Sequence, residues 1–373
     1  MFTAKGPWPW SFLMVDHSPP PRLALSTASL IARLVGIGAV VAVVAGAFAY
    51  VNGTLDPQRL RPTTLVNALE TNNGVHPGFR RNHAKGVCVA GYFESSAEAR
   101  AYSSAQVFSA AKTPIIGRFA LPSGNPYAPD SSVPIRSFAV QFTQANGQQW
   151  RTGMNSMPVF PVGTPEAFYQ LLKAGAPDPA TGKPNPASMP AFFASHPETA
   201  PFLAWVKTAR PSASYATETY NGINAFYLVS ADGKRQAVRW GVVPQSQDAP
   251  GDSAPAGNDF LEKDLVQRLA AGPLRWQLNM TLANPGDPLD DASKTWAGEH
   301  KVINVGSLVL DSSQPQADGD CRDINFDPLI LPSGIEASND PLLAARSAAY
   351  ASSYLRRAGE VSPLHNAPQE SKP

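Results

Sequence analysis

The sequence is poor in cysteine and in charge, and both shortages exclude classes of protein. Its 373 residues include two cysteines, Cys88 and Cys321, too few for a four-cysteine zinc site or for a scaffold held by several disulfides. Charged residues make up 16% of the chain, against roughly 25% in an average globular protein. The formal net charge is +1 and no basic run occurs, so we expect no nucleic-acid partner.

Local signatures of several enzyme classes are missing as well. The chain contains no G-x-x-x-x-G-K-[ST], H-E-x-x-H, G-x-G-x-x-G or G-x-S-x-G motif, the patterns that mark nucleotide, zinc-protease, dinucleotide and hydrolase sites. Taken singly, each histidine is expected to be structural or solvated. The six are scattered, with no pair spaced to bind one metal ion: His17, His76, His83, His196, His300 and His365.

One long apolar run lies near the N-terminus. Residues 34–51 are eighteen uncharged, mostly apolar residues, which just reaches the length of a membrane helix. We expect an anchor, with Arg22 and Arg33 before it favouring a cytoplasmic N-terminus. A cleaved signal peptide is the second interpretation, because Ala47-Phe48-Ala49 resembles a cleavage site.

The anchor divides the chain into regions. The expected order is a cytoplasmic tail, the anchor, a linker, one folded domain and a flexible C-terminal tail, at residues 1–33, 34–51, 52–62, 63–360 and 361–373. The folded domain would then lie outside the cytoplasm, in the periplasm. A disulfide between Cys88 and Cys321 is permitted there but not required, and two separate buried thiols are the favoured interpretation.

Turn signals divide the folded domain into short strands. Asn146-Gly147 and Asp232-Gly233 each separate two alternating segments, which is a strong hairpin signal. Strands are expected at 135–142, 148–154, 223–230, 235–243, 87–94, 115–121, 275–282 and 302–310. About eight strands indicate a mostly antiparallel barrel or sandwich. Helices are expected at 164–174, at 258–271 and near the C-terminus, with polar loops at 175–190, 249–258 and 312–319.

The C-terminal helix has the clearest boundaries. Asp340 can cap it, Pro341 suits its first position and Gly359 fits just beyond its end. Its side chains at spacings of four, four and three place two arginines around two tyrosines on one face: Arg346, Tyr350, Tyr354 and Arg357. From spacing alone, an ordinary surface helix is the simpler interpretation.

Three segments stand out together. The first is Arg80-Arg81-Asn82-His83-Ala84-Lys85-Gly86, the second is Asn155-Ser156-Met157-Pro158-Val159-Phe160, and the third is the R-x-x-x-Y pattern of Arg346 and Tyr350. In this order they resemble the haem catalase superfamily, whose first segment reads R-x-x-H-A-K-G, and most closely its minimal members, the catalase-related peroxidases. The resemblance spans about residues 63–358 and implies an α+β fold: an eight-stranded antiparallel barrel with surrounding helices, here preceded by one transmembrane helix.

The resemblance also implies a cofactor, haem b (iron protoporphyrin IX), and a role for each matching residue. Tyr350 would be the iron ligand as a phenolate, with Arg346 one turn earlier supplying a cation that favours the charged form. His83 would act as general acid and base on bound peroxide, and Asn155 would orient the peroxide.

The remaining roles concern the porphyrin. Arg80, Arg118 and Arg357 correspond to the partners of the haem propionates. Phe160 and Phe168 would pack against the porphyrin, although ordinary core packing explains them nearly as well.

The chain departs from the family's large members in ways that bear on activity. It ends within 25 residues of Tyr350, Ala120 stands where a hydroxyl residue usually holds the distal histidine, and Asn82 replaces an apolar residue. We therefore expect a peroxidase that reduces hydrogen peroxide or organic hydroperoxides with an external reducing co-substrate, with weak catalase activity at most. A hydroperoxide isomerase or dehydratase of the allene oxide synthase kind, a haem carrier or sensor, and a membrane-tethered β-rich binding module are the alternatives.

Overall fold

The computed structural model describes residues 26–51, 60–210, 212–246 and 257–364, and the chain divides into two compact units, Met1–Arg59 and Leu60–Pro373. In the first unit the described part is one helix, α1 (Thr27–Val51), with no buried residue and an apolar window of mean hydropathy 2.4. The helix begins seven residues before the expected anchor. By length and composition it can cross a membrane, and a signal sequence satisfies the same criterion.

Three of the expected regions include residues that the structure does not describe. Residues 1–25 of the expected tail, 52–59 of the expected linker and 365–373 of the expected C-terminal tail lie outside the described residues. The folded unit begins with α2 (Pro62–Asn73), which starts at the expected boundary.

Eight antiparallel strands of the second unit close into a barrel. Around the ring they follow the order β7-β5-β4-β3-β2-β1-β9-β8, and β7 pairs with β8 to complete the circle. Their bounds are β1 Gly86–Ser95, β2 Lys112–Ala120, β3 Ser137–Thr143, β4 Gln149–Asn155, β5 Tyr220–Asn221, β7 Arg235–Pro244, β8 Leu274–Leu282 and β9 Val302–Pro315. Closure removes unpaired strand edges, and the expected barrel is confirmed.

Both predicted hairpins are present. β3 and β4 join around Asn146-Gly147, and β6 (Phe226–Val229) joins β7 around Asp232-Gly233; Gly147 and Gly233 both have φ of 81°. A positive φ is what glycine adopts without a steric penalty. β6 and the short β10 (Ile335–Ala337) extend the sheet beyond the ring. β5 and β10 were not predicted, because two or three residues show no measurable alternation.

The interior of the barrel is filled by aromatic and branched side chains. Inward residues such as Phe119, Phe138, Trp150 and Trp276 are fully buried in one cluster. The rings of Phe119 and Phe138 stack with centroids 4.3 Å apart. Because the inside is occupied by side chains, a cofactor must bind against the outer face of the barrel strands.

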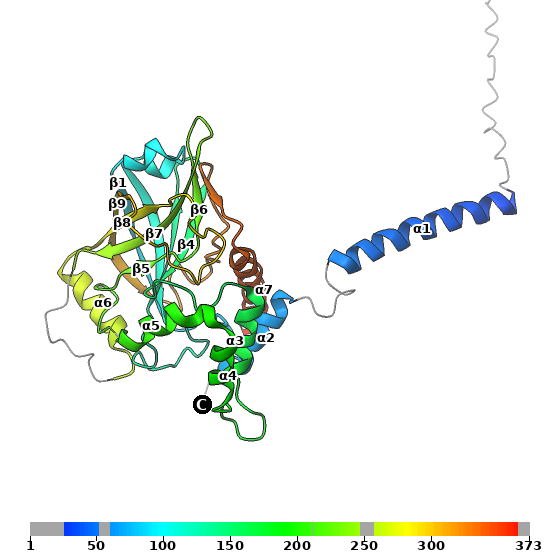
Figure 1. Cartoon of the computed structure of the whole chain (residues 1–373), viewed down its shortest axis with the longest axis horizontal. Helices are drawn as coiled ribbons and strands as arrows, with labels where there is room; N and C mark the ends of the chain where they lie inside the picture. The colour runs from blue at the N-terminus through cyan, green and yellow to red at the C-terminus, as the bar shows by residue number, and fades with distance from the viewer. Residues whose placement is uncertain (1–25, 52–59, 211, 247–256, 365–373) are drawn as a thin grey trace, which may run out of the picture. The chain divides into compact units, whose positions relative to one another are not determined.

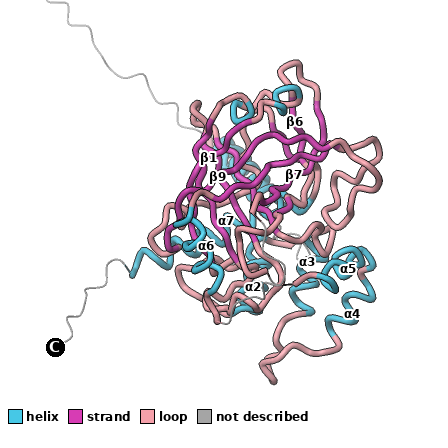
Figure 2. Tube along the Cα trace, turned by 90° about the vertical axis from the view of Figure 1, so that its left-hand side faces the viewer, coloured by secondary structure: helices cyan, strands magenta, loops and turns pink. Residues whose placement is uncertain are grey.

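The helices gather at one end and along one side of the barrel. Figure 1 shows α3 (Pro165–Ala174), α4 (Ser188–Ser195) and α5 (Ala200–Thr208) beneath the strands, with α2 and α7 (Pro341–Leu364) beside them. Figure 2, turned by 90°, again places α3, α4 and α5 below the magenta strands. The predicted α3, α6 (Phe260–Ala271) and α7 are confirmed. The helices α2, α4 and α5 were not predicted, because few of their residues are buried and their apolar pattern is weak.

The boundaries of α7 agree with prediction at one end only. The backbone N–H of Leu342 donates to the Asp340 carboxylate at 2.9 Å, so Asp340 caps the helix as expected. Gly359 does not end it, because the helix continues to Leu364. The physical reason is Glu360, whose carboxylate accepts hydrogen bonds from the N–H of Gly78 at 2.9 Å and from Arg81, holding the helix in place past the glycine.

The prediction that Cys88 and Cys321 are two separate buried thiols was wrong. Cys88 of β1 and Cys321 form a disulfide, with Cα atoms 5.3 Å apart and 233 residues apart in sequence. Gly319 makes the close approach possible, because a Cβ there would lie 2.6 Å from the Cys88 sulfur. Sequence spacing cannot reveal a pairing that depends on the path of a distant loop. The loop 316–324 is therefore tied covalently to the barrel.

Candidate active site

One face of strands β1 to β4 carries a row of small and polar side chains. Gly86, Ala120, Ser137 and Asn155 are successive partners across the four strands. Residues directly opposite one another share a face, and their chain neighbours point the other way. The neighbours Val87, Phe119, Phe138 and Met154 belong to the buried interior, so the row lies on the outer face of the barrel.

His83 is held in an unusual backbone conformation just before β1. Its φ is 56°, in the left-handed region that non-glycine residues seldom adopt. Its own N–H donates to the side-chain oxygen of Asn82 at 3.0 Å, and the N–H of Ala84 donates to the carbonyl of Ser123 at 2.7 Å. Such a conformation costs about 1–3 kcal/mol and persists where its surroundings fix it.

The electrostatic surroundings of His83 keep its ring neutral. Burial lowers the pKa of the imidazole to about 3, and the charges of Arg118, Arg346 and Arg80 act in the same direction. The buried Nδ1 has no hydrogen-bond partner among the described residues. Ala120, on the neighbouring strand, has no hydroxyl that could reach it. The ring of His83 is therefore neutral, and its Nδ1 makes no hydrogen bond to any described residue.

Asn155 ends strand β4 and is bonded to the row. The hydroxyl of Ser137 donates to its Oδ1 at 2.6 Å, and its backbone pairs with Asn221 of β5. Gly153, two residues earlier on the same face, leaves space for two side chains of α7. A Cβ at this position would lie 3.2 Å from Nη2 of Arg346 and 3.9 Å from the hydroxyl of Tyr350. β4 thus connects Asn155 with the C-terminal helix.

Tyr350 and Arg346 lie one turn apart on α7, facing β4. Nη2 of Arg346 donates to the Tyr350 hydroxyl at 3.5 Å and to the carbonyl of Gly153 at 3.4 Å. Nη1 donates to the side-chain oxygen of Asn224 at 2.5 Å, and the amide of Asn224 donates to Asp340 at 2.8 Å. The chain of hydrogen bonds from the helix cap fixes the guanidinium beside the phenol.

Three arginines converge on the loop 316–324, and no buried carboxylate of the described residues neutralises them. Nη2 of Arg80 donates to the carbonyls of Cys321, Arg322 and Ile324 at 2.9–3.1 Å. Arg118 donates to the side-chain oxygen of Gln316, and Arg357 donates to the carbonyl of Arg322. These are neutral acceptors, so the three positive charges are left for a ligand.

The charges of this arginine cluster oppose one another. Desolvation lowers the pKa of Arg80, and Arg118 and Arg357 lower it further; burial lowers the pKa of Arg118 to about 9. The nearest carboxylate to Arg357 is Asp323 at 3.9 Å, and its side chain is 73% exposed. A buried, uncompensated positive cluster is costly by itself and favours an anionic ligand.

Glycine provides the space for one of these guanidinium groups. A Cβ at Gly86 would lie 2.7 Å from the Arg118 guanidinium carbon and 2.2 Å from the carbonyl oxygen of Phe119. This explains the glycine that follows Ala84-Lys85. The lysine is structural: its amine contacts Asp130 at 2.7 Å and Asp259 at 2.8 Å.

An ionic network joins the His83 loop to the helices. Arg81 is 5% exposed and contacts Glu70 of α2 at 2.6 Å and Glu360 of α7. Arg356 contacts the same Glu70 at 2.6 Å. Because Arg81 lies between Arg80 and His83 in sequence, the network fixes the loop against the helix that carries Tyr350. The sequence analysis did not identify these partners, since ion pairs between distant segments leave no local pattern.

Phe160 and Phe168 lie apart from the arginine cluster. Their rings contact each other with centroids 5.4 Å apart, in a small apolar cluster with α3 and α4. Both side chains are partly exposed. The contacts fit ordinary packing, and they leave part of each ring available to a ligand.

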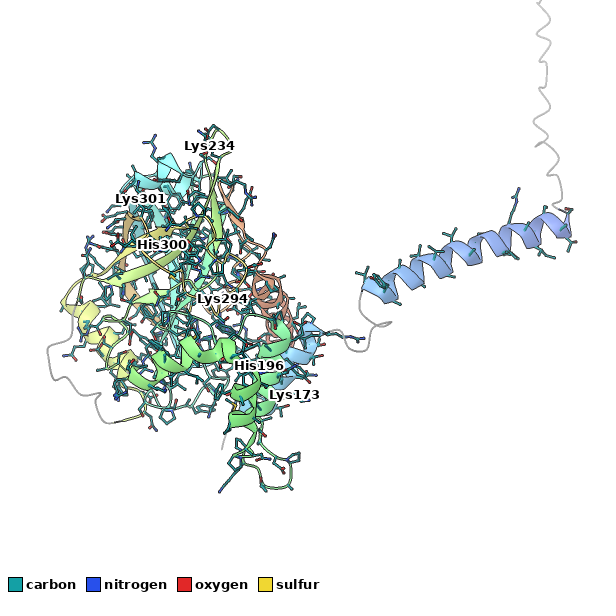
Figure 3. All side chains as sticks on the ribbon, in the orientation of Figure 1. Lys173, His196, Lys234, Lys294, His300 and Lys301 are labelled. Carbon is teal, nitrogen blue, oxygen red and sulfur yellow. A yellow bond between two sulfur atoms is a disulfide. The ribbon has the colours of Figure 1, made fainter. Side chains whose placement is uncertain are left out.

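The remaining described histidines do not join the site. His196 stacks on Phe192 with ring centroids 4.0 Å apart, and His300 contacts Asp287 at 2.8 Å. Figure 3 shows them well separated, His196 by the α3–α5 helices and His300 over the strands. Within the described ranges, no group of three or more His, Cys, Asp or Glu residues could hold a metal ion.

The structure brings most of the predicted site residues together. Mutual electrostatic influence connects His83 with Arg80, Arg118 and Arg346, and Arg80 with Tyr350. Asn155 joins them through β4 and Arg357 through the loop 316–324. Ser137 and Gln316 were not predicted. The alternation of β3 could have placed Ser137 on the outer face, whereas Gln316 lies in a loop with no such signal.

Comparison with known proteins places this arrangement in a family. The family model described as catalase matches residues 52–367. The chain is similar to the catalase-related peroxidase of Synechococcus elongatus, with 39% identity over 79% of this chain and 88% of the relative. It is 31% identical to the catalase-related peroxidase of Mycolicibacterium paratuberculosis, over 80% of this chain and 96% of that one.

A solved structure has the same fold. The "Structure of a bacterial catalase" superposes with a TM-score of 0.68 and 22% identity, covering 85% of this chain and 66% of that chain. At this identity the likeness concerns the fold. Together with the family match, it establishes that this chain belongs to the catalase family and is an oxidoreductase that acts on peroxide.

Proposed function

We propose that the chain is a haem b-dependent peroxidase that reduces hydrogen peroxide or an organic hydroperoxide at the expense of an external electron donor. The observation that carries the proposal is the arginine cluster: Arg80, Arg118 and Arg357 converge with no buried carboxylate. The phenol of Tyr350 with its neighbouring cation Arg346, and the neutral imidazole of His83, complete the set. The set is complementary to a planar ligand with two carboxylates and a metal.

The residues present fit haem. Its two propionates would pair with the three guanidinium groups, which removes the cost of an uncompensated positive cluster. Tyr350 would hold the iron through its phenolate oxygen, and Arg346, 3.5 Å from that oxygen, stabilises the anion. Phe160 and Phe168 would contact the porphyrin with their exposed ring atoms. Bound haem would supply a ferric iron that weakens the peroxide O–O bond.

The distal residues would move one proton and orient the substrate. His83, neutral above about pH 3, can accept the proton from one peroxide oxygen and return it to the other, which then leaves as water or an alcohol. Asn155 would donate from its amide to the peroxide and fix its orientation. Overall, two electrons and two protons from the donor reduce the hydroperoxide to an alcohol and water.

A second, reducing substrate distinguishes this function from its rivals. An isomerase of the allene oxide synthase kind needs no donor, and a carrier needs neither a proton-transferring imidazole nor an orienting amide. The neutral imidazole and the hydroxyl-bonded amide on the outer face support turnover. Weak oxygen-producing catalase activity is compatible with the same site.

We further propose that α1 anchors the enzyme with its catalytic unit outside the cytoplasm, in the periplasm. The disulfide Cys88–Cys321 supports an oxidising compartment, since disulfides seldom persist in the cytoplasm. The mean hydropathy of 2.4 supports a membrane helix.

The experiment uses the full chain, solubilised in detergent and loaded with haem. The absorption spectrum reports the axial ligand, and peroxide-dependent oxidation of a dye donor reports the reaction. Tyr350→Phe is expected to remove the phenolate charge-transfer band and to weaken haem retention. His83→Ala is expected to retain haem and to lose about 10²–10⁴-fold in reaction with peroxide, the range of general acid–base catalysis.

His300→Ala is the matched control, because this histidine contacts Asp287 and the carbonyl of Gly298 and none of the proposed haem contacts. It should behave as the parent protein does. A colourless protein after haem loading, or a histidine-ligated spectrum, would rule out the proposed cofactor site. Full turnover of an organic hydroperoxide without consumption of the donor and without release of oxygen would favour the isomerase.

A further inference from the structure

The hydroxyl of Ser137 contacts the side chain of Asn155, and this contact points to a role in positioning. It rests on the proposed function, since Asn155 is the residue that would orient the peroxide. We propose that Ser137 fixes the orientation of the Asn155 carboxamide, so that its amide N–H, and not its carbonyl, faces the substrate. Ser137 itself would not touch the peroxide.

The contact is well fixed by its surroundings. Ser137 is 6% exposed, and its hydroxyl lies 2.6 Å from Oδ1 of Asn155, its direct partner across the β3–β4 ladder. Beside it, the backbone N–H of Ser156 donates to the carbonyl of Arg136 at 2.8 Å, a bond that does not involve the Ser156 side chain. Two cross-strand neighbours with fixed backbones leave little freedom to the side chains.

The direction of the hydrogen bond decides what the amide can offer. A carboxamide has one accepting oxygen and one nitrogen with two hydrogens. The Ser137 hydroxyl occupies the oxygen, which leaves Nδ2 without a partner among the described residues and available as a donor. The terminal torsion of asparagine is soft and roughly two-fold. Without the hydroxyl, the carboxamide can turn over and present its oxygen, which would repel a peroxide oxygen.

The neighbouring position gives an independent reason. Ala120 pairs with Ser137 across β2 and β3, and both lie in the row on the outer face. The resemblance to the catalase family implies that a hydroxyl at the position of Ala120 usually holds the distal histidine. Here Nδ1 of His83 has no hydrogen-bond partner among the described residues. The hydroxyl belongs instead to Ser137, one strand further along, and it contacts Asn155. Orientation of the substrate would therefore depend on the amide more than on a fixed imidazole.

The test uses cyanide binding to the ferric, haem-loaded full chain in detergent. Cyanide is a small ligand whose outer atom accepts hydrogen bonds, and its binding is read by absorbance without turnover. The variants are Ser137→Ala, Asn155→Ala and the double variant. Ser156→Ala is the matched control, since its hydroxyl contacts the backbone N–H of Arg136 and not Asn155. Haem content and the unfolding midpoint are measured for each.

We expect Ser137→Ala to raise the dissociation constant of cyanide about 3- to 10-fold, the effect of one lost hydrogen bond. Haem content should remain unchanged, and the second-order rate with peroxide should fall by a similar factor. Asn155→Ala should weaken cyanide at least as much. In the Asn155→Ala background, Ser137→Ala should have no further effect, because the hydroxyl then has no amide to hold. Ser156→Ala should leave cyanide affinity within twofold.

Two results would overturn the proposal, and they are distinguishable. If Asn155→Ala weakens cyanide while Ser137→Ala does not, or if the two effects simply add, the hydroxyl does not act through the amide. If Asn155→Ala itself leaves cyanide affinity unchanged, the amide does not face the ligand, and the proposed role of Asn155 fails together with that of Ser137.

Discussion

At the scale of single residues, the proposed reaction depends on the charge state of one imidazole. Burial is the main reason why the pKa of His83 is lowered, and the charges of Arg118, Arg346 and Arg80 act in the same direction. A base that must accept a proton from peroxide has to be neutral before the substrate arrives. Burial of the ring therefore keeps the base ready.

This charge state predicts an unusual pH dependence. With a pKa of about 3, His83 is neutral throughout the range from pH 5 to 9, so the second-order rate of reaction with peroxide should vary by less than twofold. An imidazole of ordinary pKa near 6.5 would be about 97% protonated at pH 5, and the rate would fall roughly 30-fold. The sign follows from the direction of the shift: a lowered pKa moves the loss of activity to more acidic pH.

The measurement is stopped-flow decay of the ferric spectrum with hydrogen peroxide between pH 5 and 9. Arg118→Gln serves as a comparison, because it removes one of the opposing charges, and any loss of rate at low pH should begin at a higher pH in that variant. A sigmoidal fall centred near pH 6.5 in the parent protein would contradict the proposed electrostatic role.

Residue identities at the site were more predictable than their surroundings. His83, Asn155 and Tyr350 were singled out because their segments resemble those of a known family, and their roles stay predictions. Ser137 and Gln316 could not be found in this way, because their contacts arise from the register of β3 with β4 and from the path of a loop. The lowering of the His83 pKa likewise depends on burial and on Arg118 and Arg346, which are distant in sequence.

At the scale of elements, the loop 316–324 has the largest part in the site beyond the strands and α7. It offers its carbonyls to Arg80 and Arg357 and the side chain of Gln316 to Arg118. Gln316 also donates to the carbonyl of Ala84, next to His83. The disulfide ties this loop to β1 two residues after Gly86. The covalent link therefore holds the acceptors of all three arginines in position.

Removal of the disulfide should loosen the haem site. For the double variant Cys88→Ser and Cys321→Ser we expect a loss of about 2–5 kcal/mol in unfolding free energy, typical of a disulfide that closes a long loop. Haem should dissociate several-fold faster, because the loop no longer positions the arginines. The measurements are urea unfolding and the transfer of haem to excess apomyoglobin.

Chemical reduction provides the control. A strong thiol reductant should accelerate haem loss from the parent protein and have no further effect on the double variant. Equal rates of haem loss from the parent, reduced and double-variant proteins would show that the loop keeps its position without the covalent link.

The predictability of elements follows their length and their amphipathic pattern. Strands next to a clear turn signal were found, such as β4 with its strict alternation, as were helices with a capping residue such as Asp340. The short β5 and the helices α4 and α5 were not, because their sequences show no distinct period. The end of α7 was misjudged since Glu360, through its contacts with Arg81 and Gly78, extends the helix beyond Gly359.

At the scale of the whole molecule, the sequence indicates an apolar helix followed by one folded domain at residues 63–360, and the structure divides into units Met1–Arg59 and Leu60–Pro373. The finer division into tail, anchor and linker stays a prediction. The closure of the ring through β7 and β8 could not be derived from strand spacing, because a sandwich has the same local pattern.

The two units predict how the chain behaves toward a membrane. The full chain should remain with membranes after alkaline extraction, whereas a variant that begins at Leu60 should be soluble and show the same haem spectrum, since the second unit contains all the proposed haem contacts. Two arginines in α1, Val40→Arg and Val44→Arg, should release the full chain, because each costs about 2.5–3.5 kcal/mol at the centre of a membrane helix. Val40→Leu with Val44→Leu, which keeps the helix apolar, is the matched control and should stay bound.

Intact mass of the membrane-bound protein separates the two interpretations of α1: an anchor retains residues 27–51, whereas cleavage after Ala49 would yield a shorter, soluble protein and would refute anchoring.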